Sequence, residues 1–206
     1  KVERFLILAQ YSYAVPLLLL TKVDQGISEG WNQLQQEIRD VITIQTSSVT
    51  GTGISEVREL LSSDKTLVLL GESGVGKSTL VNELVGEAVQ QTTEVRSRDN
   101  KGRHTTIARE LMLIPSGGIL IDTPGIRGIG LWDAKEALNK VFFEISEVAS
   151  YCRFSNCTHQ VEPDCAILAA IQEKEIDPQR FERYLRLVEE LDEQEERLIL
   201  QRRKSK

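Results

Sequence analysis

Residues 71–78, GESGVGKS, constrain this 206-residue chain more than any other stretch. They fit the pattern G-x-x-x-x-G-K-[ST], a loop that holds phosphate groups through backbone N–H groups and a lysine. An apolar run, 66–70, precedes the loop, and a helical pattern with Leu80 and Leu84 on one face follows it. Glycines let such a loop curl around phosphate oxygens, and the helix N-terminus adds partial positive charge. The sequence therefore predicts an α/β fold around a nucleotide phosphate site.

A second phosphate-site motif is DTPG at residues 122–125, directly after a short apolar strand. It fits D-x-x-G. We expect Asp122 to hold Mg²⁺ through a water and the Gly125 N–H to bind the γ-phosphate, while Lys77 reaches the β- and γ-phosphates and the Ser78 hydroxyl ligates Mg²⁺. The predicted loop contacts are Gly71, Glu72, Ser73, Gly74, Val75, Gly76, Lys77, Ser78 and Thr79.

Two weaker motifs lie upstream, each at the end of a predicted strand. Thr21, Lys22, Val23 and Asp24 resemble the N-K-x-D motif of GTPases, with Thr21 where Asn is usual. In that motif the Asp carboxylate accepts hydrogen bonds from guanine N1–H and its 2-amino group, which adenine lacks. Residues 46–51 resemble the S-A-x-T-G motif, whose backbone N–H meets guanine O6, and they supply Ser47 and Ser48. Each motif alone is also typical of an ordinary strand end or loop.

The order of the motifs carries information of its own. In a standard GTPase the phosphate loop comes first and the base-reading motifs come last, whereas here both base-reading motifs precede residue 71. The same sheet can form in either order because domain termini lie at the surface and are often close together. The order predicts a circularly permuted P-loop GTPase.

The polar stretch 87–103 and the residues after it have the position of a nucleotide-sensing loop. Thr105 or Thr106 would ligate Mg²⁺, and we favour Thr106 because it adjoins the next predicted strand. Ile126 stands where many GTPases carry a glutamine that orients the attacking water. His104 is our candidate for that task, and the alternative is a surface histidine without a role. The basic residues of the stretch indicate either an RNA contact or a solvated loop.

All three cysteines fall within 14 residues, in the pattern C-x₄-C-x-H-x₅-C. Three thiolates and one imidazole complete a tetrahedral zinc shell with no open position, so we expect one structural Zn²⁺. A disulfide explains the pattern poorly, because the number of cysteines is odd. The predicted zinc ligands are Cys152, Cys157, His159 and Cys165.

Length and helical patterning predict a GTPase domain over residues 1–148 and a mostly helical zinc-binding domain over 149–206. The highly charged stretch 193–206 is expected to fray. Net charge is −6, so any RNA contact would need a local basic patch. There is no run of 18 apolar residues, and no membrane span is expected. The sequence opens within a helical pattern and without an initiator Met, so we expect that a segment precedes it.

In combination, TKVD, SSVTG, GESGVGKST, GRHTT, DTPGI and the zinc pattern resemble the ribosome small subunit-dependent GTPase A family (RsgA, also YjeQ). The resemblance covers nearly the whole chain. The family carries an N-terminal OB-fold, and nothing here precedes the first predicted helix. The resemblance implies a monomeric bacterial cytoplasmic GTPase that binds GTP, GDP and Mg²⁺ and acts late in assembly of the small ribosomal subunit. It implies stimulation of hydrolysis by the subunit, an rRNA contact through the zinc domain, and catalysis with His104, Lys77 and Thr106.

Two other functions stay open from the residues alone. One is an ATP-using P-loop enzyme, such as a metabolic kinase or ATPase. The other is a nucleotide-binding RNA-interaction module without significant turnover.

Overall fold

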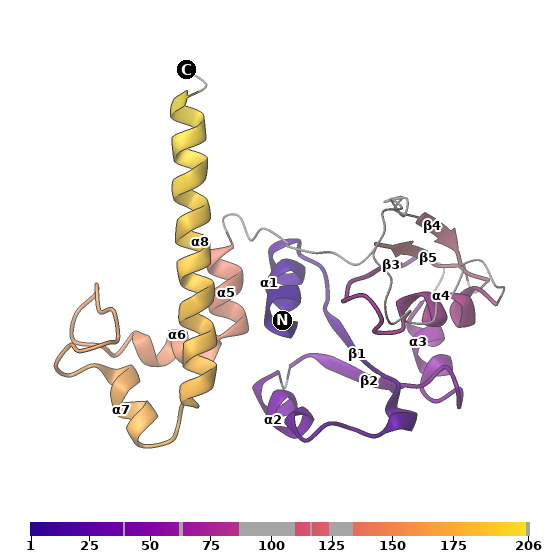
Figure 1. Cartoon of the computed structure of the whole chain (residues 1–206), viewed down its shortest axis with the longest axis horizontal. Coiled ribbons are helices and arrows are strands. Elements are labelled where there is room, and N and C mark those ends of the chain that lie inside the picture. Colours follow the sequence, from indigo (N-terminus) through magenta and orange to yellow (C-terminus); the bar gives the residue numbers. More distant parts are fainter. Residues whose placement is uncertain (39, 62–63, 87–109, 116, 124–133, 205–206) are drawn as a thin grey trace, which may run out of the picture. The chain divides into compact units, whose positions relative to one another are not determined.

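The computed structural model describes all residues except 39, 62–63, 87–109, 116, 124–133 and 205–206 (Figure 1). Its contacts divide the chain into two compact units, residues 16–128 and residues 1–15 with 129–206. In the described part, no helix is long and apolar enough to span a membrane. The predicted site residues His104, Thr105, Thr106 and Gly125 lie outside the described residues.

The unit of residues 16–128, here called the nucleotide unit, has two small sheets among its described residues. In the first, β1 (Leu17–Thr21) pairs in parallel with β2 (Ile42–Thr46). In the second, β5 (Ile119–Asp122) lies between β3 (Thr66–Leu69), to which it is parallel, and β4 (Glu110–Leu113), to which it is antiparallel. Continuous apolar runs such as 17–20 are typical of parallel strands.

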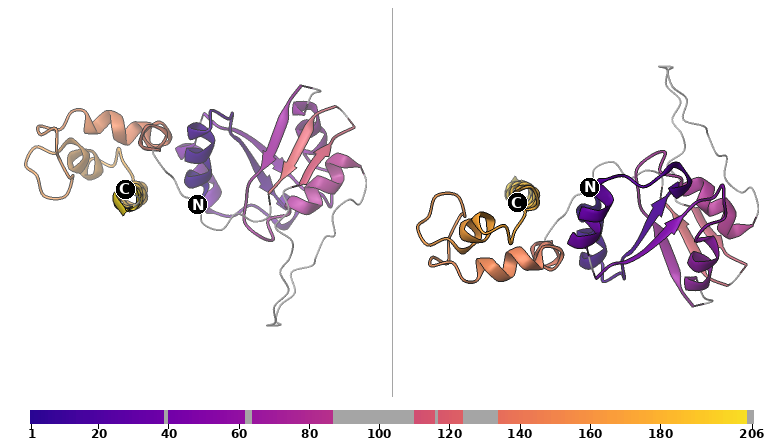
Figure 2. Two further views of the ribbon diagram at one scale, coloured as in Figure 1. Left: turned by 90° about the horizontal axis from the view of Figure 1, so that it is seen from above. Right: turned by 90° about the horizontal axis from the view of Figure 1, so that it is seen from below.

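Helices pack on one face of the second sheet (Figure 2). The helices of this unit are α2 (Gly30–Glu37), α3 (Ile54–Leu60), α4 (Lys77–Val85) and the short 3₁₀ helix η1 (Val23–Gln25). Val57 of α3, Val81 of α4 and Leu120 of β5 are fully buried in one apolar cluster. This cluster fixes the strands relative to the helices, so it also fixes the loops at the strand ends where the predicted motifs lie.

The other unit, here called the helical unit, consists of helices around a second apolar cluster. Its helices are α1 (Val2–Tyr11), α5 (Lys135–Val141), α6 (Phe143–Ala149), α7 (Ala166–Gln172) and α8 (Pro178–Lys204). The apolar spacing of residues 134–148 is that of a helix, but the segment forms two helices, which meet at the fully buried Phe142. Asp177 caps the start of α8, since its carboxylate accepts a hydrogen bond from the Gln179 N–H.

The helix α1 belongs to the helical unit, so the compact units differ from the predicted division at residues 148 and 149. Ile7 of α1 is buried in the helical core, and α1 packs against α5. Glu3 is also buried, and its Oε1 accepts hydrogen bonds from Arg180 Nη1 at 3.0 Å and Arg183 Nε at 2.8 Å. Because both arginines lie on α8, charge as well as apolar packing attaches α1 to this unit.

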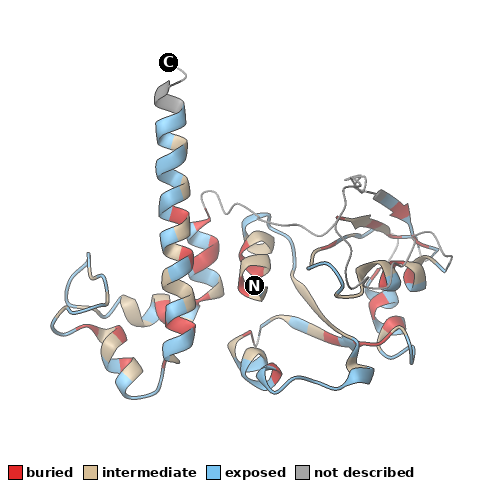
Figure 3. Ribbon diagram, viewed as in Figure 1, coloured by how far each residue is buried: buried red, intermediate tan, exposed pale blue. Residues whose placement is uncertain are grey.

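The helix α8 continues to Lys204 as one 27-residue helix, beyond the point where fraying was expected. Its first half packs on the helical core, and most of its second half is exposed (Figure 3). Arg197 and Glu193 pair one turn apart on this exposed part, an arrangement that supports a polar helix without a core contact.

Candidate nucleotide-binding site and metal centre

The loop 71–78 has the backbone geometry that the motif predicts. Gly76 has φ +100°, a conformation that other residues rarely adopt, and α4 begins at the next residue. The ammonium group of Lys77 lies across the loop, where its Nζ donates to Gly71 O at 2.8 Å and to Glu72 O at 2.7 Å. Burial lowers the pKa of Lys77, and the negative charge of Asp122 opposes that shift. The loop thus holds a cation beside an acidic group at the start of a helix.

The loop after β1 is tied to this phosphate loop by two side chains. Thr21 Oγ1 donates to Val75 O at 2.7 Å, and Lys22 Nζ donates to Gly74 O at 2.8 Å. Lys22 has a left-handed backbone, with φ +60°, and leads directly into the 3₁₀ helix η1. Two segments far apart in the sequence therefore form one loop cluster.

Asp24 is exposed, and a buried serine fixes its orientation. Ser47 Oγ donates to Asp24 Oδ1 at 2.5 Å, and the same hydroxyl accepts hydrogen bonds from the N–H groups of Val49 and Thr50. The loop 47–52 closes at Gly53, where an added Cβ would lie 2.1 Å from Gln45 O. The carboxylate consequently faces solvent from a rigid support, as recognition of a base edge requires.

Asp122 ends β5 opposite Leu69, the last residue of the strand before the phosphate loop. The next residue, Thr123, is buried, and its Oγ1 donates to Leu69 O at 2.6 Å. We did not predict this contact from the sequence, where only the position of Thr123 inside the DTPG motif indicated a role. The bond holds the acidic motif against the strand that leads into the phosphate loop.

The structure brings together the predicted residues of 21–24, Ser47, the phosphate loop and Asp122 within the nucleotide unit. Ser48 adjoins this cluster and is half-buried, but its predicted contact with guanine stays a prediction. The roles expected of His104, Thr105, Thr106 and Gly125 also stay predictions.

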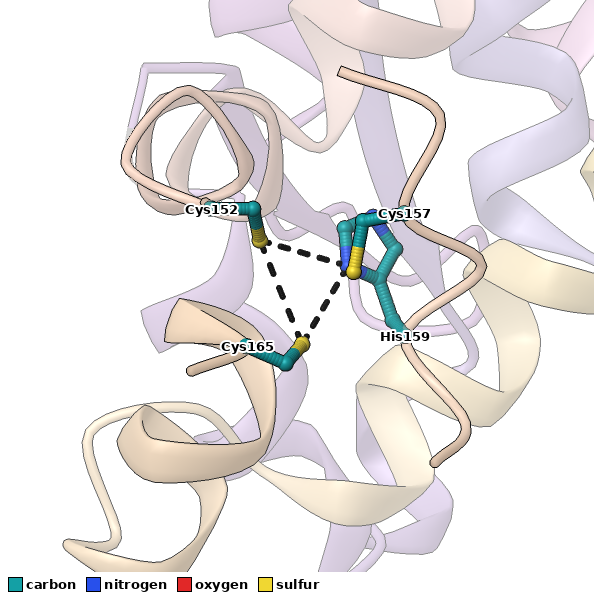
Figure 4. A group of neighbouring side chains, drawn as sticks. All are labelled: Cys152, Cys157, His159 and Cys165. Carbon is teal, nitrogen blue, oxygen red and sulfur yellow. Dashed lines mark hydrogen bonds between the residues drawn. The ribbon is translucent and has the colours of Figure 1, made fainter. Parts of the chain in front are cut away.

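The four predicted zinc ligands converge in the helical unit (Figure 4). Their ligand atoms all lie within 4.8 Å of one another. His159 Nδ1 is 3.5 Å from the Sγ atoms of both Cys152 and Cys165, and those two sulfurs are 3.9 Å apart. Ligands of tetrahedral zinc, at about 2.0–2.3 Å from the metal, lie roughly 3.3–3.8 Å apart, so the cluster fits the ion.

The titration behaviour of these groups also fits a divalent cation. Burial raises the pKa of Cys152, but hydrogen bonds from the Ile167 and Ala166 backbone outweigh this effect and lower it. Burial and the neighbouring thiols raise the pKa of Cys157 to about 11. Burial lowers the pKa of His159, which favours the neutral imidazole that metals bind. A divalent cation nearby would favour the thiolate form of Cys157, which its surroundings oppose.

Comparison with known proteins agrees with this architecture. The sequence model of a family described as RsgA GTPase matches residues 1–132. A Methanosarcina acetivorans protein named small ribosomal subunit biogenesis GTPase RsgA is 44% identical over 93% of this chain and 52% of its own length. This chain thus spans about half the length of the curated relatives it matches.

Two solved structures are similar to the chain. The crystal structure of YjeQ from Thermotoga maritima has a TM-score of 0.59 at 28% identity, covering 92% of this chain and 64% of its own. That of YloQ, described as a circularly permuted GTPase, has a TM-score of 0.62 at 25% identity and covers 94% of this chain and 62% of its own. The predicted fold class, a permuted GTPase with a helical region that carries a Cys₃His cluster, is confirmed.

Proposed function

This chain belongs to the RsgA GTPase family, and we propose that it binds GTP and hydrolyses it to GDP and phosphate with Mg²⁺. The observation that carries the proposal is the tie between the base-reading loop and the phosphate loop through Thr21 and Lys22. An ordinary glycine-rich turn gives no reason for hydrogen bonds from a second motif more than 50 residues away in the sequence. Here the tie sets a carboxylate at a fixed position relative to a phosphate cradle.

Each side chain has a defined task in this proposal. Asp24 accepts hydrogen bonds from guanine, and Lys77 neutralises charge on the β- and γ-phosphates. Ser78 would hold Mg²⁺ directly and Asp122 would hold it through a water, and the ion would neutralise negative charge on the phosphates. From the sequence we add Thr106 or Thr105 as a Mg²⁺ ligand, Gly125 at the γ-phosphate, and His104 to orient the attacking water.

The first experiment tests the base preference. Asp24→Asn replaces an oxygen that accepts from guanine by an amide that donates, so we expect GTP and GDP affinity to fall about 100-fold. Asp40→Asn removes the same charge from an exposed position in the same unit and should leave affinity unchanged. Equal binding of ATP and GTP by the unaltered chain would instead favour the ATP-using enzyme.

We further propose that the chain acts in late assembly of the small ribosomal subunit and contacts its rRNA. The relatives' name, small ribosomal subunit biogenesis GTPase, supports a role in making that subunit. An assembly factor of this kind would act in the cytoplasm. We also propose that the chain is a monomer. Steady-state GTP hydrolysis with and without purified small subunits tests this. Strong stimulation supports the assembly role. If neither this chain nor a full-length relative is stimulated, the ribosomal role is wrong, and absence of any turnover above background favours the RNA-interaction module.

The proposed metal centre is one structural Zn²⁺ held by Cys152, Cys157, His159 and Cys165. All four positions of a tetrahedral shell are filled by protein, which leaves no place for a substrate. The ion would replace the apolar core that the exposed loop 153–164 lacks. Metal analysis of the purified chain should give one zinc per molecule.

A further inference from the structure

The loop that carries His159 is folded around the carboxylate of Glu162. Oε1 accepts hydrogen bonds from the Thr158 N–H at 2.7 Å and from Thr158 Oγ1 at 2.6 Å. Oε2 accepts from the N–H groups of Gln160 at 3.0 Å and Val161 at 3.1 Å. Four donors therefore converge on one side chain, and three of them are backbone groups on either side of a predicted metal ligand.

The backbone of this loop needs such a support. His159 has φ +59° and Asp164 has φ +58°, and the left-handed region is unfavourable for residues with a side chain. The loop has no helix or strand whose backbone bonds could impose these angles. Successive N–H groups that converge on one anion, as in a nest, fix a backbone in this way. The Glu162 carboxylate therefore supplies the backbone hydrogen bonds that a helix or strand would otherwise supply.

The contacts also show that Glu162 does not act as a metal ligand. Both of its oxygens are engaged by the loop, and the cluster of converging ligand atoms contains three cysteines and one histidine only, among the residues the structure describes. Hydrogen bonds from Thr158 hold the pKa of Glu162 well below its usual range, so the carboxylate stays ionised at neutral pH.

We propose that Glu162 is the positioning residue of the metal centre: by holding Thr158, Gln160 and Val161 it sets the His159 imidazole toward the three thiols before metal arrives. This inference rests on the proposed metal centre. Groups that orient metal ligands commonly change metal affinity by about 10–100-fold when they are replaced. Pre-ordering has this effect because the loop no longer loses its conformational freedom when the ion binds.

The test is a titration of the metal-free chain with Co²⁺, whose absorption spectrum reports both affinity and ligand set. Glu162→Gln keeps an acceptor on one side but turns an amide N–H₂ toward loop donors, and Glu162→Ala removes all four bonds. We expect Co²⁺ affinity to fall at least about 10-fold in Glu162→Gln and further in Glu162→Ala. Glu175→Gln, at an exposed position in the same unit, is the charge-matched control and should bind as the unaltered chain does.

Co²⁺ affinity and the spectrum at saturation together distinguish a positioning role of Glu162 from a ligand role. Weaker binding with the unaltered spectrum at saturating Co²⁺ supports the proposal, because the ligand set is then intact and only its pre-ordering is lost. Unchanged affinity in Glu162→Ala overturns it. A different spectrum at saturation also overturns it, since Glu162 would then be a ligand. If the unaltered chain binds no Co²⁺, the metal centre itself is wrong. Guanine nucleotide binding, measured on the same samples, shows whether each variant remains folded.

Discussion

In the nucleotide unit, hydrogen bonds from threonine hydroxyls and lysine ammonium groups to backbone carbonyls tie together loops that already lie at the ends of strands. In the helical unit, the polar framework consists of buried ion pairs and a cluster of metal-ligating atoms. The sheets of the nucleotide unit already bring its loops close together. Each of these hydrogen bonds therefore changes the position of a loop only slightly. In the helical unit, the loop that carries the Cys₃His cluster connects the short helices α6 and α7 and itself contains no helix or strand, so each of its polar contacts determines more of the structure.

The largest expected effect is loss of the metal. Cys165→Ser should abolish zinc binding and destabilise the helical unit by several kcal/mol, because structural zinc contributes about 10–16 kcal/mol of apparent binding energy to folding. Zinc content and thermal unfolding followed by circular dichroism measure this. The exposed Ser155→Ala in the same loop is the control. GDP binding should survive in Cys165→Ser, and its complete loss would contradict the independence of the two units.

The second effect concerns the ion pairs that hold α1. Arg180 is 3% exposed; its Nε donates to Glu144 and its Nη1 to Glu3, and its guanidinium lies 4.2 Å from the centre of the Phe142 ring. Arg180→Met leaves the buried Glu3 carboxylate and the half-buried Glu144 carboxylate with fewer partners and should cost about 3–5 kcal/mol of unfolding free energy.

The matched control for that change is Arg186→Met, on the same helix. The side chain of Arg186 is 72% exposed and pairs with Glu182, so its loss should cost no more than about 0.5 kcal/mol. Denaturation in guanidinium chloride measures both variants. Equal losses of unfolding free energy in the two variants would show that the buried ion pairs stabilise the position of α1 no more than a surface ion pair does.

The smallest effect is expected in the nucleotide unit. Thr21→Val removes the hydrogen bond to Val75 O while keeping the shape of the side chain, and should weaken GDP affinity about 5–10-fold, equal to roughly 1 kcal/mol. Thr21→Ser retains the hydroxyl and should bind GDP as tightly as the unaltered chain does. Zinc content should not change in either variant. If Thr21→Val binds GDP as tightly as the unaltered chain, the sheets alone place the base-reading loop.

Sequence patterns recovered most of the nucleotide unit because its signals are local. The run TLVLL before the glycines indicates β3, and the spacing of Leu80 and Leu84 indicates α4, as the structure shows. The ligands of the metal cluster were equally readable, since four residues of the right type stand within 14 positions. Such patterns persist in the fold because period and spacing fix which side chains share a face or a loop.

The contacts that only the tertiary structure decided join residues that no local pattern relates. Nothing around Glu3 indicates that it meets Arg180, so α1 was predicted as part of the GTPase domain. Likewise, no motif shows that Thr21 would donate to Val75 O, or that Thr123 would donate to Leu69 O. The sequence by itself determined the type of fold, the glycine-rich loop and the four side chains of the Cys₃His cluster. The place of α1 in the helical unit depended on buried charges and apolar side chains that find partners only when distant segments pack together.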